Sequence, residues 1–461
     1  MSFKKIFLRS LLAITLAGLS YGIYYASQAF PILSGYGAKS LCSCVMLGGR
    51  QPEDVIKHEL GGGALKLGSF EFHPEDSSAT GSVFGFAKRK AVYRKGLGCT
   101  LLSEIGEQEL RNQKFILSQA PALNQDTIQW PSGNLVKDTL IHDFDYEKLT
   151  QAVNNAFNEP GEDKNRRTRA ILIVYNGRII VEKYAEGFGK NSRLLGWSMT
   201  KSLTNAYLAL LVKNGKLSLN DKAPIAEWKN DNRNAITINN LMQMSSGLAW
   251  KEIYSGPSDA TNMLFKKKDA GIFASHQPLK YQPDSVFYYS SGTTNILSRI
   301  IRHTVGDSVY YNLPYQQLFY KIGMNSMVLE PDAGGTFVGS SFAFATARDW
   351  ARFGILYLND GMWGNERILP KGWVEYSSTP ARNARRGEYG AQFWLNAGEP
   401  GNPQNRMYPD VPTDLFWADG YEGQNVFIIP SENLVVVKLS LSSGNYLDDN
   451  KFLADIINTL H

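Results

Sequence analysis

A serine and a lysine stand three residues apart in the stretch GWSMTKSLTNAYLALLVKNG, which begins at Gly196. A serine hydroxyl is too weak an acid to ionise at neutral pH, so it becomes a nucleophile only when an adjacent base removes its proton. Lysine can be that base when burial and neighbouring cations lower its pKa. Ser198 and Lys201 would lie on one face of a helix that begins here. The pair therefore indicates nucleophilic catalysis.

The Ser-x-x-Lys pattern alone does not separate this chemistry from an ordinary polar first turn, because the same pattern occurs at residues 2–5. Histidine is the more usual base for a serine nucleophile. None of the six histidines lies in a local catalytic signature, and no Gly-x-Ser-x-Gly elbow occurs after residue 30. A histidine-based hydrolase is therefore the less favoured alternative.

The residues after Ser198 have the periodicity of a helix that could position the pair. Lys213 falls in the last predicted turn, and Gly215 is typical of a helix C-terminus. The N-terminus of such a helix would add exposed N–H groups beside the reacting oxygen. The apolar positions repeat at spacings of three and four residues: Leu203, Ala206, Tyr207, Leu210 and Leu211.

Residues 1–30 are predicted to be a membrane anchor or a signal segment. Lys4, Lys5 and Arg9 precede about twenty mostly apolar residues without a charge, which is long enough to span a bilayer. An uncleaved anchor is favoured because this stretch is long for a signal peptide. The small residues of Ser27-Gln28-Ala29 keep a cleaved signal peptide open, and a buried helix of the fold is the third alternative.

The rest of the composition is that of an ordinary globular protein. The formal net charge of +5 is small for 461 residues and lies partly in the leader, so no nucleic-acid partner is expected. The basic run at residues 266–268 is interpreted as a solvated helix face or loop.

Residues 31–140 are predicted to form a small N-terminal module of unknown role, rich in glycine and containing an apparent hairpin with a polar Lys88–Lys90 centre. All three cysteines lie in the first hundred residues. A disulfide between Cys99 and either Cys42 or Cys44 is one possibility, and three free thiols are the other. Cys-Ser-Cys is poor zinc spacing, so no metal is expected.

Residues 141–461 are predicted to form the main domain. Two β-rich runs meet at Asn176-Gly177, the dipeptide that type I′ hairpin turns favour, and a second hairpin turns at residues 430–433. Helical patterns cover residues 145–157 and 447–460, and a mostly helical region lies between the hairpins. The predicted fold class is α/β: a sandwich with an antiparallel sheet flanked by helices, and an inserted all-α region.

From about residue 145 the chain resembles the β-lactamase-related serine hydrolases. This family includes class C β-lactamases, D-aminopeptidases, penicillin-binding proteins, family VIII esterases and 6-aminohexanoate-dimer hydrolases. The last group is the most similar, through the segments GWSMTKS, YSSGTTN and ADGYEGQ, which follow one another in the family's order. The resemblance covers roughly two thirds of the chain and implies a β-lactamase/penicillin-binding-protein-like fold.

The resemblance also implies roles for single residues. Ser198 would be the acylated nucleophile, Lys201 its proton partner and Tyr289, which has Tyr288 as its neighbour, the residue that passes the proton to the leaving group. The oxyanion hole would use the backbone N–H groups of Ser198 and Tyr421. The family's chemistry needs no metal and no cofactor. Together with the leader, the resemblance implies a membrane-anchored or secreted protein that faces the periplasm of a Gram-negative cell.

Two departures from the family's pattern bear on the substrate. Ser291 replaces the usual asparagine of the second motif, so a hydrogen bond to substrate or to Lys201 could be shorter or absent. Ala418 and Asp419 replace the lysine and its neutral partner in the third motif, which ends at Gly420. An aspartate there would repel a substrate carboxylate and could bind a substrate amine.

Aromatic residues crowd the same motifs and could line an apolar cleft that excludes water. The sequence thus predicts a serine hydrolase that cleaves an ester or amide bond of a small molecule. The alternatives are a β-lactamase or D,D-peptidase acting on β-lactams or peptidoglycan, and a catalytically silent binding protein on the same fold. The predicted substrate-binding residues are Trp197, Ser291, Trp417, Asp419 and Gly420.

Overall fold

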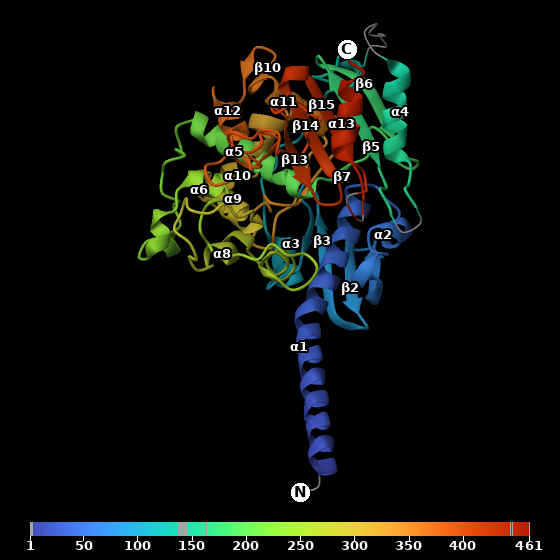
Figure 1. Ribbon diagram of the computed structural model, residues 1–461, viewed down its shortest axis with the longest axis vertical. Coiled ribbons are helices and arrows are strands. Elements are labelled where there is room, and N and C mark those ends of the chain that lie inside the picture. The colour runs from blue at the N-terminus through green and yellow to red at the C-terminus, as the bar shows by residue number, and fades with distance from the viewer. Residues whose placement is uncertain (1–2, 137–144, 162–163, 443, 445, 461) are drawn as a thin grey trace.

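The computed structural model describes residues 3–136, 145–161, 164–442, 444 and 446–460 (Figure 1). The predicted domain boundary between residues 140 and 141 lies outside these ranges. The body of the molecule is a helix-flanked sheet with a helical region beside it, and one long helix projects from it at the N-terminus (Figure 1).

The main sheet has six antiparallel strands in the order β12-β13-β14-β15-β5-β6. Strands from near the C-terminus thus pair directly with strands from the middle of the chain, since Val436 of β15 lies opposite Ile173 of β5. The bounds are β5 (Ala170–Tyr175), β6 (Arg178–Tyr184), β12 (Trp394–Leu395), β13 (Phe416–Gly420), β14 (Gln424–Ile429) and β15 (Leu434–Leu439).

Both predicted hairpin turns are confirmed. Asn176 and Gly177 have φ angles of 48° and 75°, the left-handed pair that a type I′ turn requires, and they join β5 to β6. Asn433, also left-handed with φ 48°, ends the turn that joins β14 to β15. Residue types that tolerate positive φ therefore set the register of both hairpins.

Helices cover both faces of the main sheet. On one face α4 (Tyr146–Phe157) and α13 (Asp449–Ile457) bury Leu149, Val153 and Leu453 against the strands. On the other face α11 (Ala347–Leu358) contacts β14, β15 and β5, and α5 (Thr200–Lys213) packs into the same core. Alternate residues of the buried strands feed each core, as the side-chain alternation of a two-sided sheet demands.

Helices predominate over strands in the region between the hairpins, as predicted. The three-stranded sheet β7-β9-β8 and the hairpin β10-β11 are its small strand elements in the described residues. The helices are α6 (Ile238–Met242), α7 (Asp259–Lys266), α8 (Ala270–Ser275), α9 (Ser291–Val305), α10 (Asp307–Tyr310) and α12 (Trp373–Ser378), and the strands are β7 (Leu194–Leu195), β8 (Val328–Leu329), β9 (Ala343–Ala345), β10 (Met362–Trp363) and β11 (Glu366–Arg367).

The N-terminal helix α1 (Phe3–Met46) is longer than the sequence pattern indicated. It continues without a break through Pro31, so the predicted boundary between residues 30 and 31 falls inside one helix. Its first half is exposed and its second half is buried, because residues 32–43 pack against a four-stranded antiparallel sheet. That sheet consists of β1 (Gly68–His73), β2 (Ser78–Val83), β3 (Phe86–Arg94) and β4 (Gly98–Leu101), beside the short helices α2 (Pro52–His58) and α3 (Glu107–Asn112).

The hairpin in this module turns at Phe84-Gly85, between β2 and β3, rather than at the basic triplet. The residues of that triplet lie inside β3, where Lys90 pairs with Asp76 and Glu107. Polar partners thus account for Lys90 and Arg89 within the strand, since Arg89 donates to the carbonyl oxygen of Leu102 and to Ser103 Oγ.

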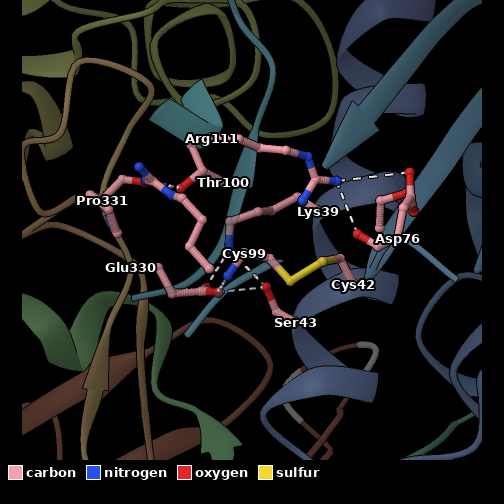
Figure 2. The surroundings of a disulfide bond; sticks show 11 residues. Lys39, Cys42, Ser43, Asp76, Cys99, Thr100, Arg111, Glu330 and Pro331 are labelled. Atoms are coloured by element: carbon pink, nitrogen blue, oxygen red, sulfur yellow. Dashed lines mark hydrogen bonds and ion pairs between the residues drawn. A yellow bond between two sulfur atoms is a disulfide. The ribbon is translucent and has the colours of Figure 1, made fainter. Parts of the chain in front are cut away.

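A disulfide joins Cys42 of α1 to Cys99 of β4 and leaves Cys44 free, which resolves the alternatives that the sequence left open (Figure 2). Beside it the carboxylate of Glu330 accepts hydrogen bonds from Lys39 Nζ, from Ser43 Oγ at 2.8 Å and from the backbone N–H of Cys99 at 2.6 Å (Figure 2). Burial lowers the pKa of Lys39, and the charge of Glu330 opposes that shift. The disulfide therefore fixes α1 to the small sheet, and the buried ion pair fixes it to Glu330, directly after β8.

Candidate active site

Ser198 lies in a single 3-10 turn, Trp197–Met199, directly before α5, rather than in the first turn of an α-helix. Gly196 makes this turn possible, since a Cβ there would lie 2.4 Å from the ring of Trp350. Trp197 has a φ of 46°, an uncommon conformation for a bulky residue. Strain of this kind gathers at functional sites, where the surrounding structure enforces it.

Lys201, in the first turn of α5, directs its ammonium group at Ser198. Its Nζ lies 2.9 Å from Ser198 Oγ, 3.0 Å from Ser291 Oγ and 3.1 Å from the carbonyl oxygen of Ser340. The side chain is buried, with 2% of the residue exposed. Burial lowers the pKa of Lys201 to about 8, although the negative charges of Glu252 and Asp419 partly oppose the shift. About a tenth of Lys201 is therefore neutral at pH 7, the form that can accept a proton, against well under a thousandth for an ordinary lysine.

Tyr289 completes the cluster from the segment before α9. Its ring lies 4.8 Å from Lys201 Nζ and packs against Tyr389 and Trp394. Burial raises the pKa of Tyr289 well above its usual value, and a hydrogen bond with Ser198 opposes that rise. Tyr288, by contrast, is 45% exposed. The structure thus brings Tyr289, and not its neighbour, to the predicted nucleophile.

Ser291 is the N-terminal residue of α9 and bridges the lysine to a carboxylate that the sequence reasoning missed. Glu252 Oε1 accepts from Ser291 Oγ at 2.5 Å, and Glu252 Oε2 accepts from the backbone N–H of Ser291 at 2.9 Å. Tyr254 Oη lies 3.0 Å from Ser291 Oγ. The expected weakening of the contact with Lys201 is not seen, because the serine hydroxyl reaches Nζ directly. No spacing rule in the sequence points to Glu252 or Tyr254, which come from an irregular loop.

The end of β13 lies against the nucleophile turn. At Gly420, the last residue of β13, a Cβ would lie 2.2 Å from the carbonyl oxygen of Gly196. Only glycine therefore allows this strand to approach the turn so closely. Tyr421 follows at once, and its ring meets the edge of Trp197 at 5.8 Å and stacks on Tyr254 at 6.4 Å. The backbone N–H groups predicted for the oxyanion hole thus belong to adjoining segments.

Asp419 lies in β13, beside Asn425 of β14, and not in an exposed turn. The Asn425 amide donates to its carboxylate at 2.8 Å. Burial raises the pKa of Asp419 to about 6, while the charge of Lys438 opposes the rise. Ala418, on the opposite face of the strand, is fully buried and supplies no cation.

Trp417 and Trp197, both predicted to bind substrate, pack against other aromatic residues of the protein. Trp417 is 1% exposed and packs with Trp394, Tyr408 and Phe427 in the second core, so the prediction that it lines a cleft is corrected. Strand alternation explains this, because Trp417 points to the sheet face covered by α4 and α13. Trp197 stacks on Tyr36 of α1 at 5.9 Å, with the ring planes 14° apart. The N-terminal helix therefore supports the residue next to Ser198.

The chain is similar to known proteins in both sequence and structure. The chain is 24% identical over 306 residues to a 6-aminohexanoate-dimer hydrolase of Paenarthrobacter ureafaciens, which covers 59% of this chain and 72% of that protein. A putative 6-aminohexanoate-dimer hydrolase from Bacillus anthracis is similar in structure, with a TM-score of 0.54, 24% identity, and coverage of 64% of this chain and 79% of that one. A putative beta-lactamase from Bacteroides dorei gives a TM-score of 0.55 at 17% identity, over 68% of this chain and 99% of that one.

These likenesses confirm the predicted fold. The family described as Beta-lactamase matches residues 153–457, about two thirds of the sequence, including the nucleophile turn, the Tyr289 segment and β13. The relative found by sequence and the first similar structure are both named as hydrolases. The chain belongs to the Beta-lactamase family.

Proposed function

We propose that this protein is a serine hydrolase that cleaves an ester or amide bond through an acyl-enzyme on Ser198. The observation that carries the proposal is the buried Lys201 ammonium group, 2.9 Å from Ser198 Oγ and with a pKa lowered to about 8. A lysine that only stabilised the fold would not need to lie beside a serine hydroxyl. A general base, by contrast, must lie within hydrogen-bond reach of the proton that it removes.

The reaction has two steps. Neutral Lys201 takes the proton of Ser198 while Oγ attacks the substrate carbonyl carbon, and the negative charge on the carbonyl oxygen is met by the backbone N–H groups of Ser198 and Tyr421. The carbonyl then re-forms as the bond to the alcohol or amine breaks. Tyr289 passes its proton to that leaving group and takes up the proton that Lys201 removed from Ser198, so both groups end as they began. Water attacks the acyl-enzyme by the reverse proton path and releases the acid and free Ser198.

The site favours a substrate without a carboxylate beside the scissile bond. Ala418 offers no cation to bind a carboxylate, and Asp419, at the next position of β13, would repel it when ionised. An amide or ester with a neutral or cationic acyl part therefore fits better than a β-lactam or a peptidoglycan stem peptide. A relative named 6-aminohexanoate-dimer hydrolase supports this preference.

Labelling with a fluorophosphonate tests the proposal. We expect one adduct by intact mass on the full chain in detergent, lost in Ser198→Ala and kept in Ser202→Ala, a matched serine one turn along α5. Short-chain nitrophenyl esters should turn over, with little cleavage of nitrocefin. Strong nitrocefin turnover would favour the β-lactamase alternative, and absence of the adduct on the folded protein would favour a silent binding protein.

We further propose that α1 anchors the hydrolase to a membrane, with the body on the outer side. Within the described residues α1 alone is long and apolar enough to cross a bilayer, and its most apolar window has no buried residue. Lys4, Lys5 and Arg9 would stay in the cytoplasm, and the disulfide suits an oxidising compartment such as the periplasm. Membrane fractions that resist carbonate extraction would support an uncleaved anchor, whereas a shortened soluble chain would show cleavage after the leader.

A further inference from the structure

The exposed half of α1 fixes the position of a membrane surface relative to the body. Residues 10–29 carry no charge and, at 1.5 Å per residue, span about 30 Å, the thickness of a hydrocarbon core. Lys4, Lys5 and Arg9 lie at one end of this span. Tyr24 and Tyr25, both exposed, lie toward the other, where aromatic residues favour the lipid headgroups. The outer interface therefore falls near Tyr25, where α1 enters the body.

Two parts of the body meet α1 at that level. Gly256 lies beside Tyr25, because a Cβ on it would be 2.9 Å from the tyrosine hydroxyl. On another side Phe84, at the β2–β3 turn, packs edge-on against Phe30 at 6.0 Å. Figure 1 shows β2 and α1 side by side where the helix leaves the body. We name residues 84–88 and 251–257 together the collar.

The collar has the composition of a surface that rests on lipid. Phe84 and Phe86 are 64% and 69% exposed, and Ile253 is 51% exposed, although each could have been buried in a fold of this size. Lys88 and Lys251 are exposed beside them, and within the described residues neither side chain has an ion-pair partner. Exposed apolar side chains flanked by unpaired cations are typical of a surface that binds a bilayer. The apolar side chains can enter the acyl-chain region, and the lysines can bind anionic headgroups.

One of the two segments of the collar, the loop 251–257, also contacts the active site. The loop 251–257 carries Glu252, which binds Ser291, and Tyr254, whose ring is stacked on Tyr421 beside the nucleophile turn. Along α1, the contact with Trp197 is made at Tyr36, eleven residues and about 16 Å beyond Tyr25. Because α1 is one continuous helix, no flexible linker separates the reactive serine from the interface.

We propose that the collar rests on the outer surface of the bilayer that α1 crosses, and that the Ser198 site takes its substrate from this bilayer, as an amphiphile whose apolar part stays in the lipid. The second half of this proposal rests on the proposed hydrolase function, and the first half does not. The proposed substrate class rests on the loop 251–257, which contacts Ser291 through Glu252 and lies beside Tyr25 through Gly256.

Site-specific fluorescence tests the contact independently of activity. In Phe84→Cys the new thiol is the reactive one, because Cys42 and Cys99 are bonded to each other and burial raises the pKa of Cys44 to about 12. We expect an NBD label there, on the full chain in phosphatidylcholine/phosphatidylglycerol vesicles, to shift to the blue and to be quenched by doxyl-labelled lipid.

The matched control for the label is Leu123→Cys. Leu123 is 60% exposed and lies near the end of α1 that is far from the proposed membrane. Three residues later, Asp126 binds Lys190. Lys190 is followed closely by Arg193, which lies beside Gly48, just after the C-terminal end of α1. Its label should keep the emission of a water-exposed probe. A label at residue 84 that behaves like the one at residue 123 would overturn the contact.

Kinetics on two nitrophenyl esters test the substrate class. In Phe84→Ser/Phe86→Ser, hydrolysis of nitrophenyl palmitate in the same vesicles should fall at least fivefold, while hydrolysis of nitrophenyl butyrate in water should stay within twofold of wild type. Leu123→Ser should change neither rate. Equal palmitate rates in wild type and the double variant would overturn the substrate class. If fluorophosphonate also fails to label Ser198, the hydrolase function has failed, and the NBD result still decides the contact.

Discussion

The hydroxyl of Ser291 lies 3.0 Å from Nζ of Lys201 and links that lysine to the carboxylate of Glu252. A buried base is thus joined, through one hydroxyl, to a negative charge that favours its protonated form. The balance between burial and this charge sets the pH at which Lys201 can accept a proton.

Lys201 should control the acid limb of the pH profile. Its pKa of about 8 means that the neutral base is lost as the pH falls below that value, so kcat/KM on a short nitrophenyl ester should rise with pH and level off above about 8. Lys201→Arg should lose about 10²–10⁴-fold in kcat/KM, because a guanidinium stays protonated. A profile that is flat between pH 6 and 9 would contradict this role.

Glu252→Gln should move the same limb to lower pH. The negative charge of Glu252 raises the pKa of Lys201, so its removal should lower that pKa further, while glutamine can still accept from the backbone N–H of Ser291. The measurement is the midpoint of the limb in kcat/KM. Glu375→Gln, an exposed change in α12, should leave the midpoint in place. A midpoint that moved to higher pH in Glu252→Gln would contradict the prediction that the charge of Glu252 raises the pKa of Lys201.

Tyr289 should matter for chemistry and Tyr288 should not. Tyr289→Phe keeps the ring contacts with Tyr389 and Trp394 but removes the hydroxyl that hydrogen-bonds with Ser198, so kcat should fall by about 10²-fold or more. Tyr288→Phe is the matched control and should retain kcat within twofold. Equal losses in the two variants would point to a defect of the whole segment, which the unfolding transition would report.

Asp419→Asn should stabilise the fold at neutral pH. Burial raises the pKa of Asp419 to about 6, so the native state holds a proton that the unfolded chain has already released, and stability falls as the pH rises through the window from its ordinary pKa to about 6. The neutral amide avoids that loss. We expect about 1–3 kcal/mol more stability at pH 7.5 and no gain at pH 4, by denaturant titration. Equal gains at both pH values would exclude the carboxylate charge as the cause.

The disulfide should stabilise the N-terminal half of the body. Cys42 and Cys99 are 57 residues apart in sequence, and the chain-entropy model gives about 4 kcal/mol for a loop of that length. Cys42→Ala/Cys99→Ala should therefore unfold at lower denaturant concentration, by about 2–4 kcal/mol. Cys44→Ser should respond to reductant as the wild type does. If reductant left the wild-type transition unchanged, the bond would not contribute to stability.

Much of this molecule could be predicted from its sequence because the responsible signals are local. Asn176-Gly177 determines a turn through its own backbone preferences, and the order of the three motifs identifies the fold. The role of Glu252 could not be predicted, since only the packing of its loop against α9 brings it to Ser291. The position of Trp417 depends on which face of β13 it takes, and that face is defined only once α4 and α13 cover the sheet. The length of α1 was missed because its buried half is rich in glycine, serine and alanine, which pack closely against the small sheet but give no amphipathic pattern.

The ion pair between Lys39 and Glu330 also constrains the order in which the chain can assemble. Glu330, the partner of Lys39, is synthesised 291 residues after it. Until Glu330 has been synthesised, the ammonium group of Lys39 has no counter-charge. Its burial in the core before that point would carry a large desolvation cost. The four strands that cover α1 are complete by Leu101 and can form early. A chain released before residue 330 would therefore hold Lys39 without its counter-charge and would lack the ion pair between α1 and Glu330.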